Sequence, residues 1–148
     1  MIQEPYFLFP VSVFSSQALI RNDVIGKGAF GTSRSGGRTH QGVDFLGQVG
    51  NPVYSAKSGR IVYSGEGKGY GLYIEISHPD MRFTRYAHLS KLEVNLGDWT
   101  TAGQRIGYVG KTGNADSPRV LPHLHFEIRD SKKAVDPLPL MDPLIKVS

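Results

Sequence analysis

The pair His123-Leu124-His125 can supply two imidazole nitrogens to one site. It opens a run to Ile128 in which polar and apolar residues alternate, a pattern typical of a strand. Because strand side chains alternate between two faces, His123 and His125 point to one face, while Leu124 and Phe126 point to the core. Taken alone, the pattern fits two surface histidines on a half-buried strand equally well.

A second pattern, His40-Gln41-Gly42-Val43-Asp44, places an imidazole and a carboxylate four residues apart. Zinc accepts His nitrogen at about 2.0–2.1 Å and carboxylate oxygen at about 2.0–2.2 Å, usually in tetrahedral geometry. Gly42 and the Gly-rich loop before it argue against a helix. We therefore expect His40 to end a loop and Asp44 to lie on the following strand. By itself the spacing is a weak signal, because an Asp on a turn explains it more simply.

Two His and one Asp drawn from the two patterns would give three protein ligands, the number found in a catalytic zinc site. Such a site keeps three protein ligands and leaves a fourth position for water. A closed structural site needs a fourth protein ligand, and the chain has no Cys to supply one. The ligand set therefore favours catalysis. His88 ends another alternating run but could be an ordinary surface histidine, and His78, in a turn, is interpreted as structural.

The segments around these histidines are strand-sized, β-branched and aromatic, and turn signals at 65–69, 78–80 and 97–98 separate them. No segment has a long helical period. We therefore predict a mainly β fold, an antiparallel sheet or sandwich of short strands; a groove over the sheet that holds the zinc site is what the family resemblance given below implies. Strands are expected at residues 53–56, 59–64, 72–77, 82–88, 106–109 and 123–128.

Length and composition limit the classes of protein to which this chain can belong. The 148 residues, 39% hydrophobic and 20% charged, suit one globular domain. A net charge of +4 suits an anionic partner without selecting one, and no Lys/Arg run interleaved with aromatics supports nucleic-acid binding. No stretch approaches the ~20 apolar residues of a membrane span.

The two ends of the chain differ in composition from its centre. Residues 6–14 are apolar, but Glu4 precedes them, Pro5 and Pro10 interrupt or flank them, and no cleavage pattern follows, so we find no recognisable signal peptide and leave the export route open. We interpret residues 1–25 as an arm packed on the domain. Residues 131–148, which contain three prolines, are interpreted as a tail that wraps the surface.

A series of landmarks in order gives the chain a family resemblance over residues 30–128. It resembles the lysostaphin-type or LytM-type zinc endopeptidases, whose architecture is related to lipoyl-like barrels and which cut peptidoglycan peptides. Each landmark is common alone, and their joint order is not expected by chance. They are Phe30-Gly31 with Arg34, His40-x-Gly42-x-Asp44, Gly59-x-x-Val62, Gly69-Tyr70-Gly71 with His78, Tyr86-Ala87-His88-Leu89, Gly97-Asp98, Gly103-Gln104-x-Ile106-Gly107, Thr112-Gly113-Asn114 and Pro122-His123-Leu124-His125-Phe126-Glu127.

The resemblance implies a role for each member of the site. One Zn²⁺ ion would be bound by His40, Asp44 and His125, and the catalytic residues would be His88 and His123. The metallopeptidase domain would span residues 26–130. Three side chains are also placed at the substrate groove, although ordinary packing or surface roles are alternatives for the first two: Arg34, Tyr70 and Asn114.

The function implied is a zinc endopeptidase that acts on peptidoglycan in the cell wall, periplasm or extracellular space. The stretch from Thr112 to Phe126 is similar to members from Gram-negative bacteria, which favours a D,D-endopeptidase acting on D-Ala–diaminopimelate cross-links over cleavage of glycine bridges. We expect a monomer whose partners are peptidoglycan and a specific inhibitor or immunity protein. Wall remodelling, phage lysis and a secreted toxin stay open as roles.

Two other classes of function are weighed against this one. The first is a catalytically silent LytM-type module that binds the cell wall or activates a hydrolase. It does not need an open metal site, so the five retained residues argue against it. The second is a lipoyl-like carrier domain, which needs a hairpin Lys and leaves the histidines unexplained.

Overall fold

The computed structural model describes residues 4–13 and 15–148, so residues 1–3 and 14 of the predicted arm lie outside the described residues. Nine strands form one sheet in which every pairing is antiparallel. The helical turns of the described residues are three short 3₁₀ turns: η1 (Ser35–Gly37), η2 (Gly113–Ala115) and η3 (Leu138–Leu140). The prediction of a mainly β, antiparallel fold is confirmed.

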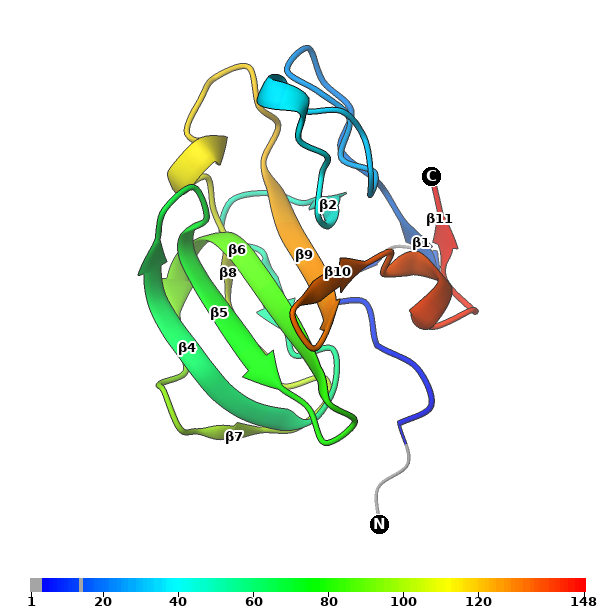
Figure 1. Ribbon diagram of the computed structural model, residues 1–148, viewed down its shortest axis with the longest axis vertical. Helices are drawn as coiled ribbons and strands as arrows, with labels where there is room; N and C mark the ends of the chain where they lie inside the picture. Colours follow the sequence, from blue (N-terminus) through cyan, green and yellow to red (C-terminus); the bar gives the residue numbers. More distant parts are fainter. Residues whose placement is uncertain (1–3, 14) are drawn as a thin grey trace.

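The central ribbon of the sheet has the strand order β10-β9-β6-β5-β4-β7 (Figure 1). Alternating β-branched and aromatic residues form its long strands, as the sequence predicts. The turn predicted at residues 65–69 is shorter than expected, because pairing with the next strand continues to Gly67 opposite Gly71. The strands are β4 (Gly59–Gly67), β5 (Gly71–Ser77), β6 (Arg82–Leu92), β7 (Trp99–Thr100), β9 (His123–Asp130) and β10 (Lys133–Val135).

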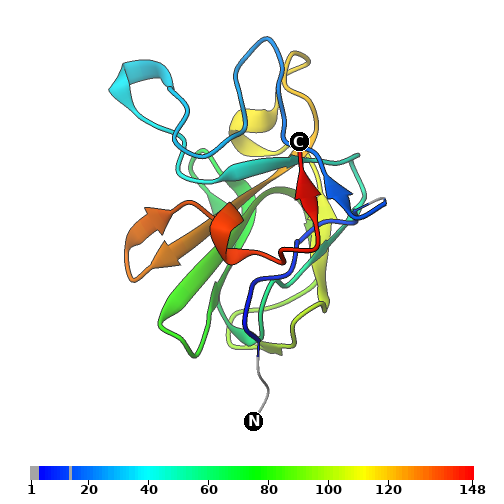
Figure 2. The ribbon, with the colours of Figure 1, turned by 90° about the vertical axis from the view of Figure 1, so that its right-hand side faces the viewer.

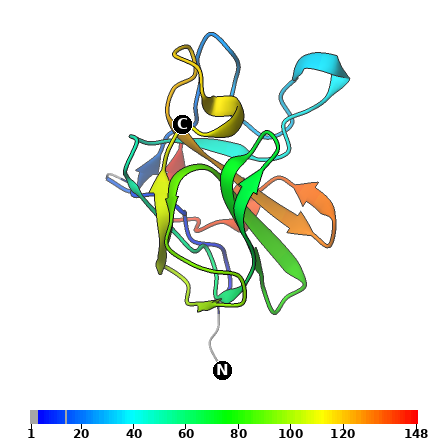
Figure 3. The same cartoon turned by 90° about the vertical axis from the view of Figure 1, so that its left-hand side faces the viewer.

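Strand β6 changes partners along its length. Its first part, to Ala87, pairs with β9, and its last part, from Leu89, pairs with β8 (Arg105–Val109). β8 in turn pairs with β3 (Pro52–Tyr54). The sheet therefore curls over on itself (Figure 3). His88 lies at the point where the partner changes, and its φ of 62° is in the left-handed region.

The core fills the space inside the curled sheet. β2 (Val43–Leu46) and β9 contribute alternate apolar residues to it, and their other side chains carry the polar groups described below. The sequence-based expectation that Leu124 and Phe126 face inward is met, since both are fully buried. The buried apolar cluster comprises Phe7, Val11, Ala18, Val43, Phe45, Val53, Ala56, Ile61, Ile74, Ile76, Tyr86, Leu89, Val94, Ile106, Val109, Leu124, Phe126, Ile128 and Met141.

Both ends of the chain pack on the sheet. Phe7 is only 1% exposed, and its backbone bridges to Met141. The short strands β1 (Gln17–Ala18) and β11 (Lys146–Val147) pair in parallel. β10 forms a hairpin with β9, so the main sheet continues past residue 130. In the part of the chain that the structure describes, no helix is long and apolar enough to cross a membrane.

Three loop regions gather at one end of the sheet, at the top of Figure 2. They are residues 20–39, which contain η1, residues 110–122, which contain η2, and the β4–β5 turn. The backbone N–H of Asn114 donates a hydrogen bond to the carbonyl of Gly69 (2.9 Å), which joins the second region to the β4–β5 turn. Loops held this way by a rigid sheet are suited to carry a functional site.

Candidate metal centre and active site

The register of β2 against β9 places a carboxylate beside an imidazole. Asp44 lies directly opposite His125, so the two side chains share one face of the sheet. Asp44 Oδ1 is 2.9 Å from His125 Nδ1. At Gly42 a Cβ atom would lie 2.4 Å from the carbonyl oxygen of Phe126. A larger residue at that position would push β2 away from β9 and separate the pair.

His40 completes the cluster from the end of the loop that precedes β2, as the sequence predicts. Its backbone amide donates to the carbonyl of Thr32, and its Nε2 lies 3.1 Å from Asp44 Oδ1 and 3.0 Å from His125 Nδ1. The three ligand atoms are therefore 2.9–3.1 Å from one another. All three residues are buried.

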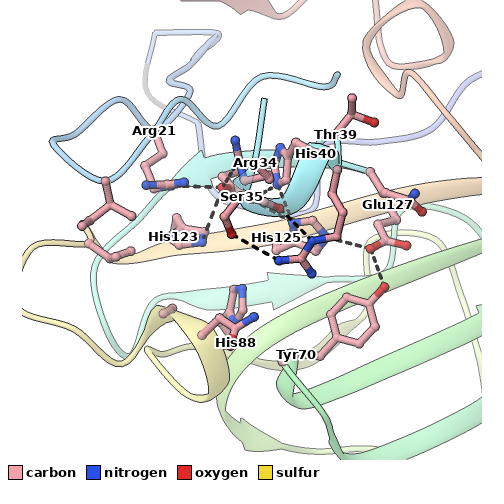
Figure 4. A pocket seen from close by; sticks show the side chains of 18 of the residues that line it. Arg21, Arg34, Ser35, Thr39, His40, Tyr70, His88, His123, His125 and Glu127 are labelled. Carbon is pink, nitrogen blue, oxygen red and sulfur yellow. Dashed lines mark hydrogen bonds and ion pairs between the residues drawn. The ribbon is translucent and has the colours of Figure 1, made fainter. Parts of the chain in front are cut away.

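The donor set fits a zinc ion. Tetrahedral ligands at about 2.0–2.1 Å from zinc lie about 3.3 Å apart, close to the spacing of these three atoms. Two nitrogens and one carboxylate oxygen are typical zinc donors, and three of them leave a fourth position. The cluster faces a groove, so that fourth position is accessible from solvent (Figure 4).

The second ring nitrogen of each ligand histidine is fixed on the side away from the cluster. The Nδ1–H of His40 donates to the carbonyl of Ala29 (3.2 Å), and the Nε2–H of His125 donates to Glu127 Oε2 (2.7 Å). In these tautomers both rings direct a lone pair at the position of the ion. Such outer partners commonly orient metal-binding histidines and raise their basicity.

The charges around His125 favour its protonated form, and the proton on Nδ1 competes with a metal ion for that nitrogen. Burial lowers the pKa of His125, but the carboxylates of Asp44 and Glu127 outweigh burial and raise that pKa to about 9. Burial opposes ionisation of Glu127, yet its hydrogen bond to His125 lowers the Glu127 pKa to about 2. The pKa of Asp44 is likewise held well below its usual value by His125 and His40, despite burial. Both carboxylates are therefore ionised at neutral pH.

Two further imidazoles flank the cluster. The Nδ1–H of His88 donates to the carbonyl of Thr112 (2.8 Å), and that of His123 donates to the carbonyl of Leu121 (2.7 Å). The ring centroids are 5.1 Å apart. Burial lowers the pKa of both rings, and the nearby His125 helps to bring that of His88 to about 3. Both rings are therefore neutral near pH 7, and Nε2 of each is unprotonated.

One groove of about 700 Å³ is lined by the three cluster residues and by the two flanking imidazoles, His88 and His123. Its floor is the face of β2 and β9 that carries the cluster, and the loop regions described above form its walls (Figure 4). Cations predominate among the charged residues of the walls: Arg34, Arg38 and Lys68. The two carboxylates that line the groove, Asp44 and Glu127, are buried and hydrogen-bonded.

Comparison with known proteins identifies the family. The model of Peptidase family M23 matches residues 38–137. The chain belongs to peptidase family M23. The resemblance to lysostaphin-type and LytM-type peptidases is thereby confirmed.

Relatives of this M23 chain include both an endopeptidase and a hydrolase activator. Peptidoglycan DD-endopeptidase ShyA of Vibrio cholerae is 40% identical over 89 residues, which cover 60% of this chain and 20% of ShyA. Murein hydrolase activator NlpD of Escherichia coli is 37% identical over 110 residues, which cover 74% of this chain and 27% of NlpD. The chain spans between 20% and 40% of the length of such curated relatives.

Solved structures share the fold of the M23 chain. A zinc containing peptidase from Vibrio cholerae superposes with a TM-score of 0.72 and 32% identity, covering 90% of this chain and 39% of that one. The catalytic domain of lysostaphin from Staphylococcus simulans superposes with a TM-score of 0.68 and 38% identity, covering 75% of this chain and 86% of that one.

The three residues placed at the substrate groove by sequence all line it, but two are engaged by the protein. The hydroxyl of Tyr70 donates to Glu127 (2.7 Å) and accepts from Arg85 (3.1 Å), so it supports the partner of His125. The guanidinium of Arg34 donates to Thr32 Oγ1 and to the carbonyls of residues 27 and 33. Asn114 belongs to η2, in the wall of the M23 groove.

Two residues of the site were missed by sequence reasoning. Glu127 follows His123 and His125 at the same period of two, so the alternation could have identified it as the third polar residue on that face. Arg21, whose Nε donates to Asp44 Oδ2 (3.0 Å), carries no such signal. It lies 23 residues before Asp44 and outside the segment matched by the M23 model.

Proposed function

We propose that this chain is a zinc-dependent endopeptidase that hydrolyses peptide bonds in bacterial peptidoglycan. One observation carries the proposal: the ligand atoms of His40, Asp44 and His125 converge to 2.9–3.1 Å on the floor of a groove that also holds two neutral imidazoles. The family match, the zinc containing peptidase and the endopeptidase ShyA support it. All five residues come from one chain, so the proposed site needs no residue from a second subunit.

In this mechanism side chains of the protein transfer the protons. A bound zinc ion would supply Lewis acidity that lowers the pKa of a water molecule and polarises the scissile carbonyl. A neutral imidazole, His88 or His123, accepts the proton of the attacking water at Nε2 and passes it to the leaving nitrogen. The other imidazole accepts a hydrogen bond from the attacking water at its own Nε2 and so orients that water. The carbonyls of Thr112 and Leu121 hold both rings in the tautomer that this needs.

The charge of the groove supports an anionic substrate. Arg34, Arg38 and Lys68 line its walls, while its carboxylates are already engaged. Stem peptides that contain diaminopimelate carry free carboxylates, whereas a glycine bridge has no charged side chain. Electrostatic attraction therefore favours the former. We accordingly propose D,D-endopeptidase activity on D-Ala–diaminopimelate cross-links, in the compartment that holds the cell wall.

The second candidate is a module that binds the cell wall or activates a hydrolase without catalysis of its own. The similarity to murein hydrolase activator NlpD favours it. An activator has no need of a three-ligand cluster with an open fourth position, nor of two imidazoles beside it. The retained constellation therefore favours the endopeptidase.

Digestion of purified peptidoglycan separates the two candidates. The chain, loaded with zinc, is incubated with sacculi cross-linked through diaminopimelate and, in parallel, with glycine-bridged sacculi. We expect mass spectrometry to show cross-linked dimers of the first type converted to monomers with the gain of one water, and a chelator to stop the reaction. Zinc binding without products from either substrate, together with faster cleavage by an added murein hydrolase, would instead support the activator.

A further inference from the structure

A buried arginine from the N-terminal segment contacts the carboxylate of the metal cluster. Arg21 is 5% exposed, and its Nε donates to Asp44 Oδ2 at 3.0 Å. Its Nη1 donates to Asp23 Oδ2 at 2.8 Å. Figure 4 shows the guanidinium reaching toward the cluster from the side opposite Glu127. A cation removed from water at this position needs such partners, so its burial is specific to the contact.

The two oxygens of Asp44 have different partners. Oδ1 lies between the ligand nitrogens of His40 and His125, while Oδ2 receives the hydrogen bond from Arg21. A carboxylate without this contact can rotate about its Cβ–Cγ bond and present either oxygen. Because the guanidinium is planar and its hydrogen bond to Oδ2 is directed, it holds the carboxylate in one orientation. Oδ1 is thereby kept toward the position of the ion.

The backbone fixes the arginine relative to Asp44. The amide of Arg21 donates to the carbonyl of Asp44 (2.9 Å), the amide of Asp44 donates to the carbonyl of Gly28 (2.8 Å), and the amide of Gly28 donates to the carbonyl of Arg21 (2.7 Å). A Cβ atom on Gly28 would lie 2.7 Å from the Cβ of Asp44. Glycine therefore allows residues 21–28 to lie directly against the middle of β2.

The same segment reaches the loop that orients His123. Asp23 Oδ2 accepts hydrogen bonds from Arg21 and from the backbone amide of Leu121 (2.9 Å). The carbonyl of Leu121 accepts from His123 Nδ1–H (2.7 Å). A continuous chain of hydrogen bonds thus runs from Asp44 through Arg21, Asp23 and Leu121 to the ring of His123.

We propose that Arg21, held by Asp23, is a positioning residue that orients Asp44 for metal binding and couples it to the loop that orients His123. The inference rests on the proposed zinc site. It extends the active centre to residues 21–28, which precede the segment matched by the family model.

Zinc affinity tests this role without relying on turnover. Arg21→Met removes the charge and keeps much of the side-chain volume. Lys57→Met is the matched control, because Lys57 is also about nine-tenths buried and paired with an aspartate, Asp80, but contacts no residue of the site. By competition with a chromophoric chelator, we expect about 10–100-fold weaker zinc binding for Arg21→Met, as is typical of a lost outer partner. We expect the zinc affinity of Lys57→Met to be unchanged, even if its melting temperature falls as much as that of Arg21→Met.

Two further variants distinguish positioning from general stability. Arg21→Lys keeps the charge without the planar fork, so it should recover part of the zinc affinity. Asp23→Asn should bind zinc within a few-fold of wild type, and its kcat should fall while KM stays constant. The Co²⁺-loaded forms report the coordination of Asp44 directly, and the visible spectrum of Arg21→Met should differ from that of wild type.

The outcomes separate this inference from the proposed function. Wild-type zinc affinity and an unchanged Co²⁺ spectrum in Arg21→Met would overturn the positioning role alone. Zinc binding by the wild type without hydrolysis, accompanied by the expected loss in Arg21→Met, would overturn the endopeptidase and support the positioning role. Failure of the wild type to bind zinc would overturn both.

Discussion

At the scale of single residues, the chemistry of the site depends on which nitrogen of each imidazole is free. Each of the four site histidines donates one N–H to a fixed acceptor, which leaves the other nitrogen facing the cluster or the groove. Three acceptors are backbone carbonyls, and the fourth is the carboxylate of Glu127. The fold thus fixes one N–H of each ring before an ion or a substrate binds, and Nδ1 of His125 must release its own proton when an ion binds. The four residues are His40, His88, His123 and His125.

The raised pKa of His125 predicts how zinc affinity depends on pH. Zinc needs the lone pair of Nδ1, which carries a proton below a pKa of about 9. Binding therefore releases one proton, and the affinity should rise about tenfold per pH unit as pH increases through the neutral range, then level off near pH 9. Zinc titrations between pH 6 and 9.5 measure this slope. Levelling off near pH 6.5, the ordinary pKa of histidine, would contradict the role of the two carboxylates.

At the scale of elements, β9 organises the site because it pairs with β2 on one side and β6 on the other. His125 lies opposite Asp44 of β2 and also opposite Ala87, the residue before His88. Alternation along β9 could be predicted from sequence, since it needs only the local pattern. The register between strands could not, because it depends on contacts between residues far apart in the chain. The positive φ of His88 likewise follows from the change of partner along β6.

Glu127 on β9 offers a prediction at this scale. Glu127→Gln preserves the shape but removes the charge that fixes the ring of His125 and raises its basicity. Above pH 9, where no proton competes for Nδ1 of His125 in the wild type, we expect zinc affinity to fall about 10–100-fold. Glu93→Gln, on an exposed carboxylate paired with Arg105 away from the groove, is the control and should bind zinc as wild type does. Equal zinc affinities in the two variants would show that Glu127 does not affect zinc binding by His125.

At the scale of the whole molecule, a buried network of hydrogen bonds connects β6 to the segment before β4. The backbone amide of Ala56 donates to the hydroxyl of Tyr86, which shares a hydrogen bond with Thr84 Oγ1. Thr84 Oγ1 in turn contacts His78 Nε2 (2.8 Å), and His78 Nδ1–H donates to the carbonyl of Ser58. Burial lowers the pKa of His78, which keeps the ring neutral. This contact pattern agrees with the structural role expected of His78 from sequence.

Two threonines test the contribution of this network to stability. Thr84→Val leaves His78 Nε2 and the Tyr86 hydroxyl without their shared partner, so the free energy of unfolding should fall by about 1–3 kcal/mol. Thr100→Val is the control, because Thr100 is equally buried but its hydroxyl has no hydrogen-bond partner among the described residues. That variant should be neutral or stabilised in urea denaturation. A larger loss in Thr100→Val than in Thr84→Val would contradict the network.

Part of the fold and of the site could be predicted from sequence, and part depends on contacts that only the folded chain makes. Local alternation and turn residues indicated the strands of the central sheet, and the five histidine and aspartate positions of the site converge as the resemblance implied. Arg21 could not be found in this way, since only the folded arm brings it to Asp44. Tyr70 lines the groove as its order along the chain indicates, but the hydrogen bond of its hydroxyl to Glu127 could not be predicted from sequence.

Digestion of diaminopimelate-type sacculi by zinc-loaded His88→Ala, beside the wild type, tests the central claim most directly. His88 contacts none of the three ligand atoms by hydrogen bond, so zinc content should stay at one ion per chain. The wild type should convert cross-linked dimers to monomers, and the variant should do so about 10²–10⁴-fold more slowly, as is typical for loss of a proton-transferring residue. Equal rates in the two proteins, with zinc retained in both, would contradict the account.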